Sequence, residues 1–146
     1  MLSAAFANDL LKLVFNGDGI TGLAANAATG ALDNLYISLH TADPGAAGAQ
    51  NASEVDYEGY ARLPVSRSTT GFTVDGTSMN PTEAWEFGEM TGGTAQTATH
   101  VCIGTDETGE GKVLFRAQLN PVINLSEGVT PRIRTSSALR ALVTFE

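Results

Sequence analysis

The sequence predicts a mainly β protein, an antiparallel β-sandwich, jelly-roll-like, with one N-terminal α-helix. Apolar residues recur at helical spacing over residues 2–15 and then, from Asn34 onward, alternate with polar residues at the period of a β-strand. Turn signals containing Gly, Asp and Pro separate the alternating segments. About eight short strands after one helix are typical of an antiparallel sandwich.

The N-terminal segment is expected to form the only long helix. Its apolar face consists of residues three or four apart, Leu2, Phe6, Leu10 and Leu13. Asn16-Gly17 is the predicted stop signal of the helix. Residues 17–33 are mostly Gly, Ala, Asn and Thr, which predicts a loop. We therefore predict a single domain over residues 1–146, with a helix and Gly/Ala-rich arm at 1–33 and a β-sandwich at 34–146.

Strand patterns fill the remainder of the chain. The clearest alternation lies at residues 35–39, 60–66, 112–119 and 138–146, and weaker strands are expected at 71–74, 84–90, 99–105 and 130–136. Residues 74–81 and 105–112 contain Gly and Asp and are predicted to be turns. Asp43-Pro44-Gly45 follows the first strand and predicts a tight turn that opens a surface loop.

The net charge and the cysteine content exclude several classes of function and a disulfide cross-link. The formal net charge of −8 would repel a phosphate backbone and an anionic membrane, so neither direct nucleic-acid binding nor membrane binding is expected. One cysteine, Cys102, excludes an internal disulfide. The N-terminus lacks a basic residue before its apolar part, and no apolar run approaches the roughly 20 residues that span a bilayer, so we expect neither a signal peptide nor a membrane span.

Several patterns resemble catalytic or ligand sites without their full context. "GDGITG" matches the glycine spacing of a dinucleotide loop, but a helix rather than a strand precedes it, which favours a flexible loop. His40 and His100 lack a nucleophile motif nearby, and a histidine beside a turn is typically a polar surface group. His100 and Cys102 share a strand face without an obvious third metal ligand. We expect no catalytic, cofactor or metal residues and no small-molecule substrate.

Charged and aromatic residues supply further hypotheses. Three carboxylate groups, near residues 54–58, 83–89 and 106–110, are interpreted as solvated acidic surface because none follows a calcium-loop pattern. Arg132 and Arg134 lie two apart, suited either to an interface or to an edge strand kept from aggregating. Trp85 and Phe87 share a face and are either a stacking platform or, as favoured in a sandwich of this size, core.

A family resemblance covers most of the chain from Leu35 onward. The segments "LYISLHTADPG", "YEGYAR", "THVCIGTDETGEGKVLFRAQL", "INLSEGVTPRI" and "ALRALVTF" are similar to small structural proteins of tailed bacteriophages. Members of this group are labelled tail-fibre proteins, and some of similar size are capsid cement, or decoration, proteins. The resemblance implies a non-enzymatic virion protein assembled in the bacterial cytoplasm, and it carries over no catalytic residue.

The absence of heptads or repeats typical of a fibre shaft favours the head of the virion over the tail. We expect a cement protein on the capsid exterior that bridges copies of the major capsid protein and contacts copies of itself. The candidate interface residues are Leu2, Phe6, Leu10, Arg132 and Arg134. The alternative is a tail-fibre or tail-tip module that binds the host receptor through its loops and Trp85.

Overall fold

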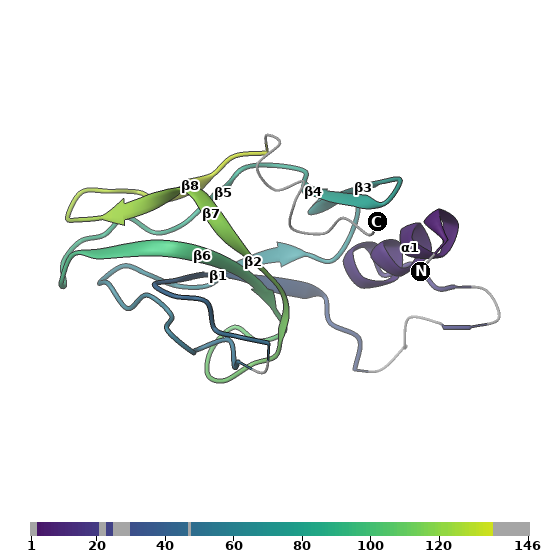
Figure 1. The fold of residues 1–146 in the computed structure, drawn as a ribbon, viewed down its shortest axis with the longest axis horizontal. Helices are drawn as coiled ribbons and strands as arrows, with labels where there is room; N and C mark the ends of the chain where they lie inside the picture. Colours follow the sequence, from purple (N-terminus) through teal and green to yellow (C-terminus); the bar gives the residue numbers. More distant parts are fainter. Residues whose placement is uncertain (1–2, 21–22, 25–29, 47, 136–146) are drawn as a thin grey trace. The chain divides into compact units, whose positions relative to one another are not determined.

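The computed structural model describes residues 3–20, 23–24, 30–46 and 48–135 (Figure 1). Its helical and strand elements follow one another along the chain: α1 (Ala4–Leu11), η1 (Lys12–Asn16), β1 (Asn34–His40), β2 (Leu63–Ser66), β3 (Phe72–Asp75), β4 (Ser78–Pro81), β5 (Trp85–Glu86), β6 (Gln96–Gly104), β7 (Val113–Leu125) and β8 (Arg132–Ile133). The mainly β class with one N-terminal helix is confirmed. The strands form antiparallel pairs, in a four-stranded sheet of order β2-β1-β6-β7 and in the pairs β3-β4 and β5-β8. This arrangement is compatible with a sandwich, and the jelly-roll connectivity stays a prediction.

The chain divides into two compact units, which are described separately. One contains residues 1–35, 65–83 and 135–146, and the other contains residues 36–64 and 84–134. Each unit has its own set of buried apolar side chains. Whether they fold as the predicted single domain, with an arm ending at residue 33, stays a prediction.

In the first unit, the N-terminal helix packs beside the β3-β4 hairpin. Ser3 caps α1 by accepting a hydrogen bond from the Phe6 backbone N–H at 3.2 Å. The buried face of α1 and η1 consists of Ala7, Leu11 and Phe15, four residues apart, and the Phe15 ring lies 5.0 Å from that of Phe72. These contacts place one face of the helix in the core of its own unit.

The helix ends where the sequence predicts, but it ends as a π-turn. η1 continues α1 directly, and Gly17 closes it with φ of 73°, a conformation that glycine adopts without steric cost. Gly17 is therefore the helix stop, and the first glycine of "GDGITG" does not follow a strand. Thr21 and Gly22, the last two residues of that motif, lie outside the described residues, so its interpretation as a loop stays a prediction.

The expectation of a turn over residues 74–81 is wrong in part. Residues 78–81 form β4, which pairs with β3 across a tight connection at Gly76-Thr77, where Gly76 has φ of 56°. Met79 on β4 is buried, so this short strand supplies a side chain to the core. The neighbouring Ser, Asn and Pro residues favour a turn, so the local sequence does not indicate this strand. The strand predicted at 138–146 lies outside the described residues.

In the second unit, the middle of the sheet is buried on both faces. β1 and β6 pair in register from Tyr36 opposite Gly104 to His40 opposite His100. Side chains on opposite faces of β1, such as Ile37 and Ser38, are each 0% exposed. Both faces of this sheet are therefore covered, which is compatible with a sandwich. The sheet differs from the common antiparallel arrangement in which one face is exposed to solvent.

Candidate functional site

Two surface loops lie side by side in the second unit. The first comprises residues 41–54 after β1, and the second comprises residues 105–112 between β6 and β7. They are joined by a β-bridge between Ala49 and Lys112 and by the Gln50 backbone N–H, which donates to the Glu110 carbonyl. We call residues 41–54 and 105–112 the loop pair. Loops held on a rigid β scaffold are common binding sites in proteins.

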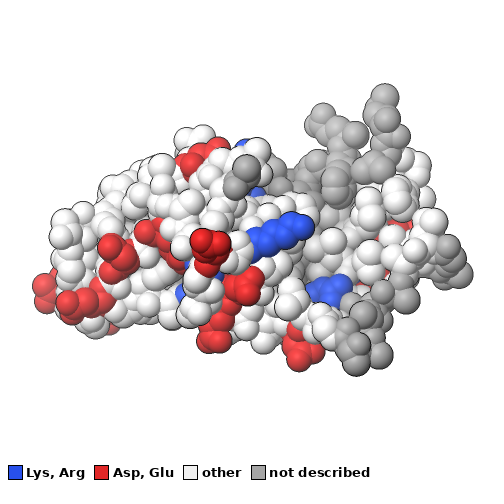
Figure 2. Space-filling view, turned by 90° about the horizontal axis from the view of Figure 1, so that it is seen from below, with Lys and Arg blue, Asp and Glu red and all other residues white. Residues whose placement is uncertain are grey.

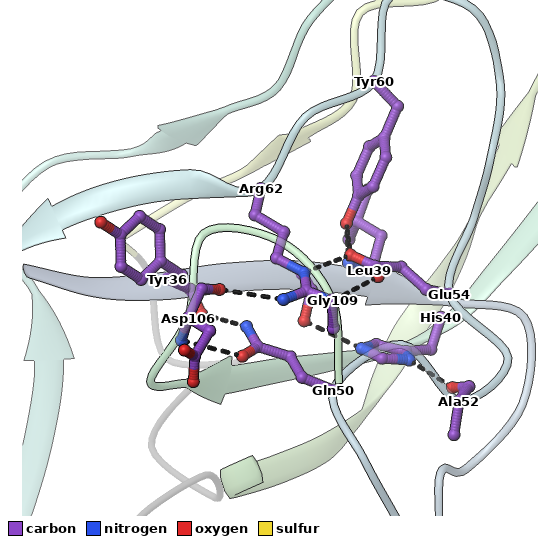
Figure 3. Close-up of polar contacts among 11 residues, drawn as sticks. Tyr36, Leu39, His40, Gln50, Ala52, Glu54, Tyr60, Arg62, Asp106 and Gly109 are labelled. Carbon is purple, nitrogen blue, oxygen red and sulfur yellow. Dashed lines mark hydrogen bonds and ion pairs between the residues drawn. The ribbon is translucent and has the colours of Figure 1, made fainter. Parts of the chain in front are cut away.

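A buried ion pair between Arg62 and Glu54 anchors the loop pair (Figure 3). Arg62 and Glu54 form a bidentate contact, with Nε to Oε1 at 2.8 Å and Nη2 to Oε2 at 2.7 Å, and their side chains are 3% and 14% exposed. The same guanidinium donates to the carbonyls of Asp106 at 2.9 Å and Gly109 at 2.6 Å. Arg62 thus holds both loops at once, and its hydrogen bonds to Glu54 raise its pKa.

Tyr60 completes this ion pair. Its hydroxyl donates to Glu54 at 2.7 Å and accepts from the Leu39 backbone N–H at 3.2 Å. Burial, reinforced by the Glu54 charge, raises the pKa of Tyr60 well above its ordinary value, so this hydroxyl keeps its proton. Every charge in the cluster therefore has a partner, which a buried polar network requires for stability.

Gln50 supports the loops in a second way. It is fully buried, its amide donates to the Tyr36 carbonyl at 3.1 Å, and its side-chain oxygen accepts from the Asp106 backbone N–H at 3.3 Å. A side chain on Gly104 would collide with it, since an added Cβ would lie 2.2 Å from the Gln50 Cδ atom. Gly104 is thus a glycine because the amide of Gln50 occupies that space.

His40 was expected to be a surface group, and this expectation is wrong. His40 is 0% exposed because the 41–54 loop folds over it: Nδ1 lies 2.8 Å from the Ala52 carbonyl and Nε2 lies 2.9 Å from the Ser38 hydroxyl. A serine beside a histidine can form a nucleophile and base, but Ser38 is also 0% exposed. Burial lowers the pKa of His40, and this pair is interpreted as structural.

The thiol at position 102 is also interior. Cys102 lies on β6 and is 0% exposed, and burial raises its pKa to about 12, which disfavours the thiolate that binds metals. Its predicted neighbour His100 is half-buried, with Nδ1 at 2.9 Å from the Thr99 hydroxyl. Across the described ranges, no group of three or more His, Cys, Asp or Glu side chains has metal-site geometry.

The turn at Asp43-Pro44-Gly45 has the predicted form. The Asp43 carboxylate accepts from the Gly45 backbone N–H at 2.8 Å, and Gly45 has φ of 82°. Asp43 Oδ1 also lies 2.8 Å from Arg116 Nε on β7, so an exposed ion pair fastens this end of the loop to the sheet. The Gly45 hydrogen bond, followed by the Arg116 charge, lowers the pKa of Asp43.

The predicted interface residues have different environments. Phe6 and Leu10 are half-buried on α1, beside the fully buried face, and Leu2 lies outside the described residues. Arg132 is exposed on β8 and forms an ion pair at 3.8 Å with Glu86 on β5, while Arg134 follows β8 and is exposed. Their role in an interface stays a prediction.

The prediction of a core position for the aromatic pair is confirmed, whereas the prediction of a solvated acidic surface is wrong for one residue. Trp85 and Phe87 are each 3% exposed, which confirms the core interpretation and removes Trp85 from any binding surface. Most predicted acidic positions are exposed, but Glu54 is not solvated as expected because it is committed to Arg62. Acidic side chains are spread over the face shown in Figure 2, whereas basic ones form isolated spots.

A second arginine, part-buried in the first unit, makes structural contacts that the sequence did not predict. Arg67 donates to the carbonyls of Leu13 at 2.5 Å and Val14 at 2.7 Å, near the end of η1, and to the Leu32 carbonyl at 3.4 Å. A cation at the C-terminal end of a helix meets carbonyl groups that lack intrahelical partners. Arg67 therefore joins the end of the helix to the end of the arm. No motif indicates the partners of these arginines, although Arg62 closes the "YEGYAR" segment and both residues lie within or beside a predicted strand, where a charged residue is notable.

Comparison with known proteins identifies the family. Among the described residues, no helix is long and apolar enough to cross a membrane. No curated protein matches the chain. Residues 1–139 match the family model described as "Podophage GP4 fiber I protein gp80", which spans both the N-terminal helix and the loop pair. The chain therefore belongs to the podophage GP4 fibre I protein gp80 family and is a phage virion structural protein.

Proposed function

We propose that this protein is a tail-fibre module that contacts the host cell surface through the loop pair. The observation that carries the proposal is the buried network under these loops, in which Arg62 binds Glu54 and two carbonyls of the 105–112 loop. Such a network reduces the conformational freedom that a binding loop would otherwise lose on contact. The fibre name of the family supports this location over the head.

The exposed part of the loop pair is polar and acidic. Asp106, Glu107 and Glu110 are exposed on the 105–112 loop, and Thr41, Asn51 and Ser53 are exposed on the 41–54 loop. These groups offer hydrogen-bond acceptors and donors without a large apolar surface, which suits a hydrated partner such as the outer polysaccharide or protein of a bacterium. The proposed role is structural, without catalysis, cofactor or small-molecule substrate.

A competition assay tests the proposal. Purified protein should bind host cells and reduce adsorption of the phage, and the Glu107→Arg/Glu110→Arg variant should lose both effects while keeping its thermal midpoint. The matched control is Glu83→Arg, an exposed carboxylate in the other unit, which should bind as wild type does. Undiminished binding by the loop variant would remove the loop pair from the proposal.

Decoration of the capsid exterior is the second candidate. It is favoured by the exposed Arg132 and Arg134 and the half-buried Phe6 and Leu10, which provide the basic and apolar contacts that a protein bridging major capsid subunits needs. Quantitative mass spectrometry of purified virions separates the two functions. A handful of copies per particle would agree with a fibre, whereas near parity with the major capsid protein would favour decoration.

A further inference from the structure

Ser53, on the 41–54 loop, has an unusual backbone conformation. It has φ of 55°, and every other described residue whose φ is positive is a glycine. At such an angle the Cβ atom of an L-residue approaches a carbonyl oxygen, which raises the free energy of every residue except glycine. Glycine would therefore suit the shape of the loop better than serine does. A serine at this position points to a role for its side chain, since strained residues cluster at functional sites.

The carbonyl groups on both sides of this strained angle contact the end of β1. The Ala52 carbonyl lies 2.8 Å from Nδ1 of the buried His40 (Figure 3). The Ser53 carbonyl accepts from the backbone N–H of Thr41 at 2.8 Å and from its hydroxyl at 3.1 Å. Successive carbonyls of an extended strand point to alternate sides, whereas these two reach adjacent residues. The positive φ of Ser53 is thus part of how the loop is fastened.

The chain that follows Ser53 is fixed as well. The Glu54 carboxylate forms the bidentate contact with Arg62, and the Val55 backbone N–H donates to the Leu39 carbonyl at 3.0 Å. These partners belong to the interior of the second unit. The side chain of Ser53, in contrast, is exposed. The buried contacts therefore hold the serine hydroxyl at a fixed position on the surface of the loop pair.

The surroundings of this hydroxyl are polar and mostly uncharged. Thr41, which contacts the Ser53 carbonyl, is exposed, and so is Asn51, two residues before Ser53. A serine hydroxyl can donate one hydrogen bond and accept others, so it can pair with a hydroxyl or an amide group. Because the backbone at this position is already fixed, binding there would order little additional chain.

We propose that Ser53 is a contact residue of the loop pair, and that its hydroxyl hydrogen-bonds an uncharged hydroxyl or amide group of the host component. This inference rests on the proposed function and deepens it. It assigns hydrogen bonding to the 41–54 loop and leaves the charged contacts to the carboxylates of the 105–112 loop. The hydroxyl, which glycine lacks, then accounts for a serine at an angle that favours glycine.

Two substitutions separate the hydroxyl from the backbone. Ser53→Ala removes the hydroxyl and keeps Cβ, whereas Ser53→Gly also relieves the strain, so the thermal midpoint of the glycine variant should equal or exceed that of the wild type. Both should raise the apparent Kd of labelled protein for host cells by roughly 2- to 10-fold, as expected for the loss of one hydrogen bond. If Ser53 were only structural, binding would follow the thermal midpoint, and Ser53→Gly would bind at least as tightly as the wild type.

Ser126→Ala is the matched control, an exposed serine at the end of β7 away from the 105–112 loop, and should bind as the wild type does. The Glu107→Arg/Glu110→Arg variant tests the proposed function in the same assay. If that variant loses binding while both Ser53 variants bind normally, the role of Ser53 is refuted and the loop pair stays in place. Equal weakening by Ser126→Ala would also refute that role. Absence of binding by the wild type would refute both this inference and the proposed function.

Discussion

The buried pair of Arg62 and Glu54 gives the sharpest prediction of stability. Arg62→Leu removes four hydrogen bonds, two to the Glu54 carboxylate and two to carbonyls of the 105–112 loop. Glu54 is left with the Tyr60 hydroxyl but without a countercharge, at a position where its side chain is 14% exposed. Breaking a buried ion pair from one side costs about 3–5 kcal/mol of unfolding free energy.

Removing both partners should lower the unfolding free energy less than Arg62→Leu alone does. In Glu54→Leu/Arg62→Leu no unpaired charge is left inside, so the double variant should regain about 1–3 kcal/mol relative to Arg62→Leu alone. Urea unfolding of the wild type, the two single variants and the double variant measures this coupling. The exposed pair of Arg132 and Glu86 is the control, and Arg132→Leu should cost less than about 1 kcal/mol. Additive losses at Glu54 and Arg62 would refute the reasoning.

Three further predictions follow from buried groups. Gly104→Ala should destabilise the protein by about 1–3 kcal/mol in urea unfolding because the new Cβ would displace the Gln50 amide, and an unchanged midpoint would contradict that contact. His40 has a folded-state pKa below its ordinary 6.5, so the unfolded chain binds the proton more readily, and stability should fall as the pH decreases below about 6.5; a His40→Gln variant should show a weaker loss over this range. Cys102, with its pKa raised to about 12, should react with a thiol reagent only after unfolding, and rapid reaction of the native protein would show that the thiol is accessible.

Periodicity was sufficient to predict the mainly β class and the N-terminal helix. The alternation at residues 35–39 predicted β1, and the helical spacing up to Phe15 followed by Asn16-Gly17 predicted both the helix and its end. β4 was missed because Ser78, Asn80 and Pro81 are turn-forming residues, and only its pairing with β3 and the burial of Met79 make it a strand. Local propensity cannot report such tertiary effects.

The candidate site was far less predictable. Glu54 was interpreted as solvated because its carboxylate group follows no calcium-loop pattern, and His40 as a surface group because it stands beside a turn; the structure buries both through the return of the 41–54 loop. The contacts of Arg62 span 44 and 47 residues along the chain, to Asp106 and Gly109. No short-range pattern encodes contacts at such separations. The polar residues within predicted strands were the available signal.

The contacts made by the basic residues determine which charges remain on the surface that a partner would contact. The chain has eight Lys and Arg, and Arg62 and Arg67 bind backbone carbonyls inside the two units. Arg116 and Arg132 face carboxylates on the surface. These four cations hold loops and strands, while Glu107 and Glu110 of the 105–112 loop are exposed to solvent. A host component that binds there must tolerate or neutralise negative charge. If that component is anionic, binding through this loop should strengthen as the ionic strength or the divalent cation concentration rises. If it is cationic, binding should weaken as salt is added.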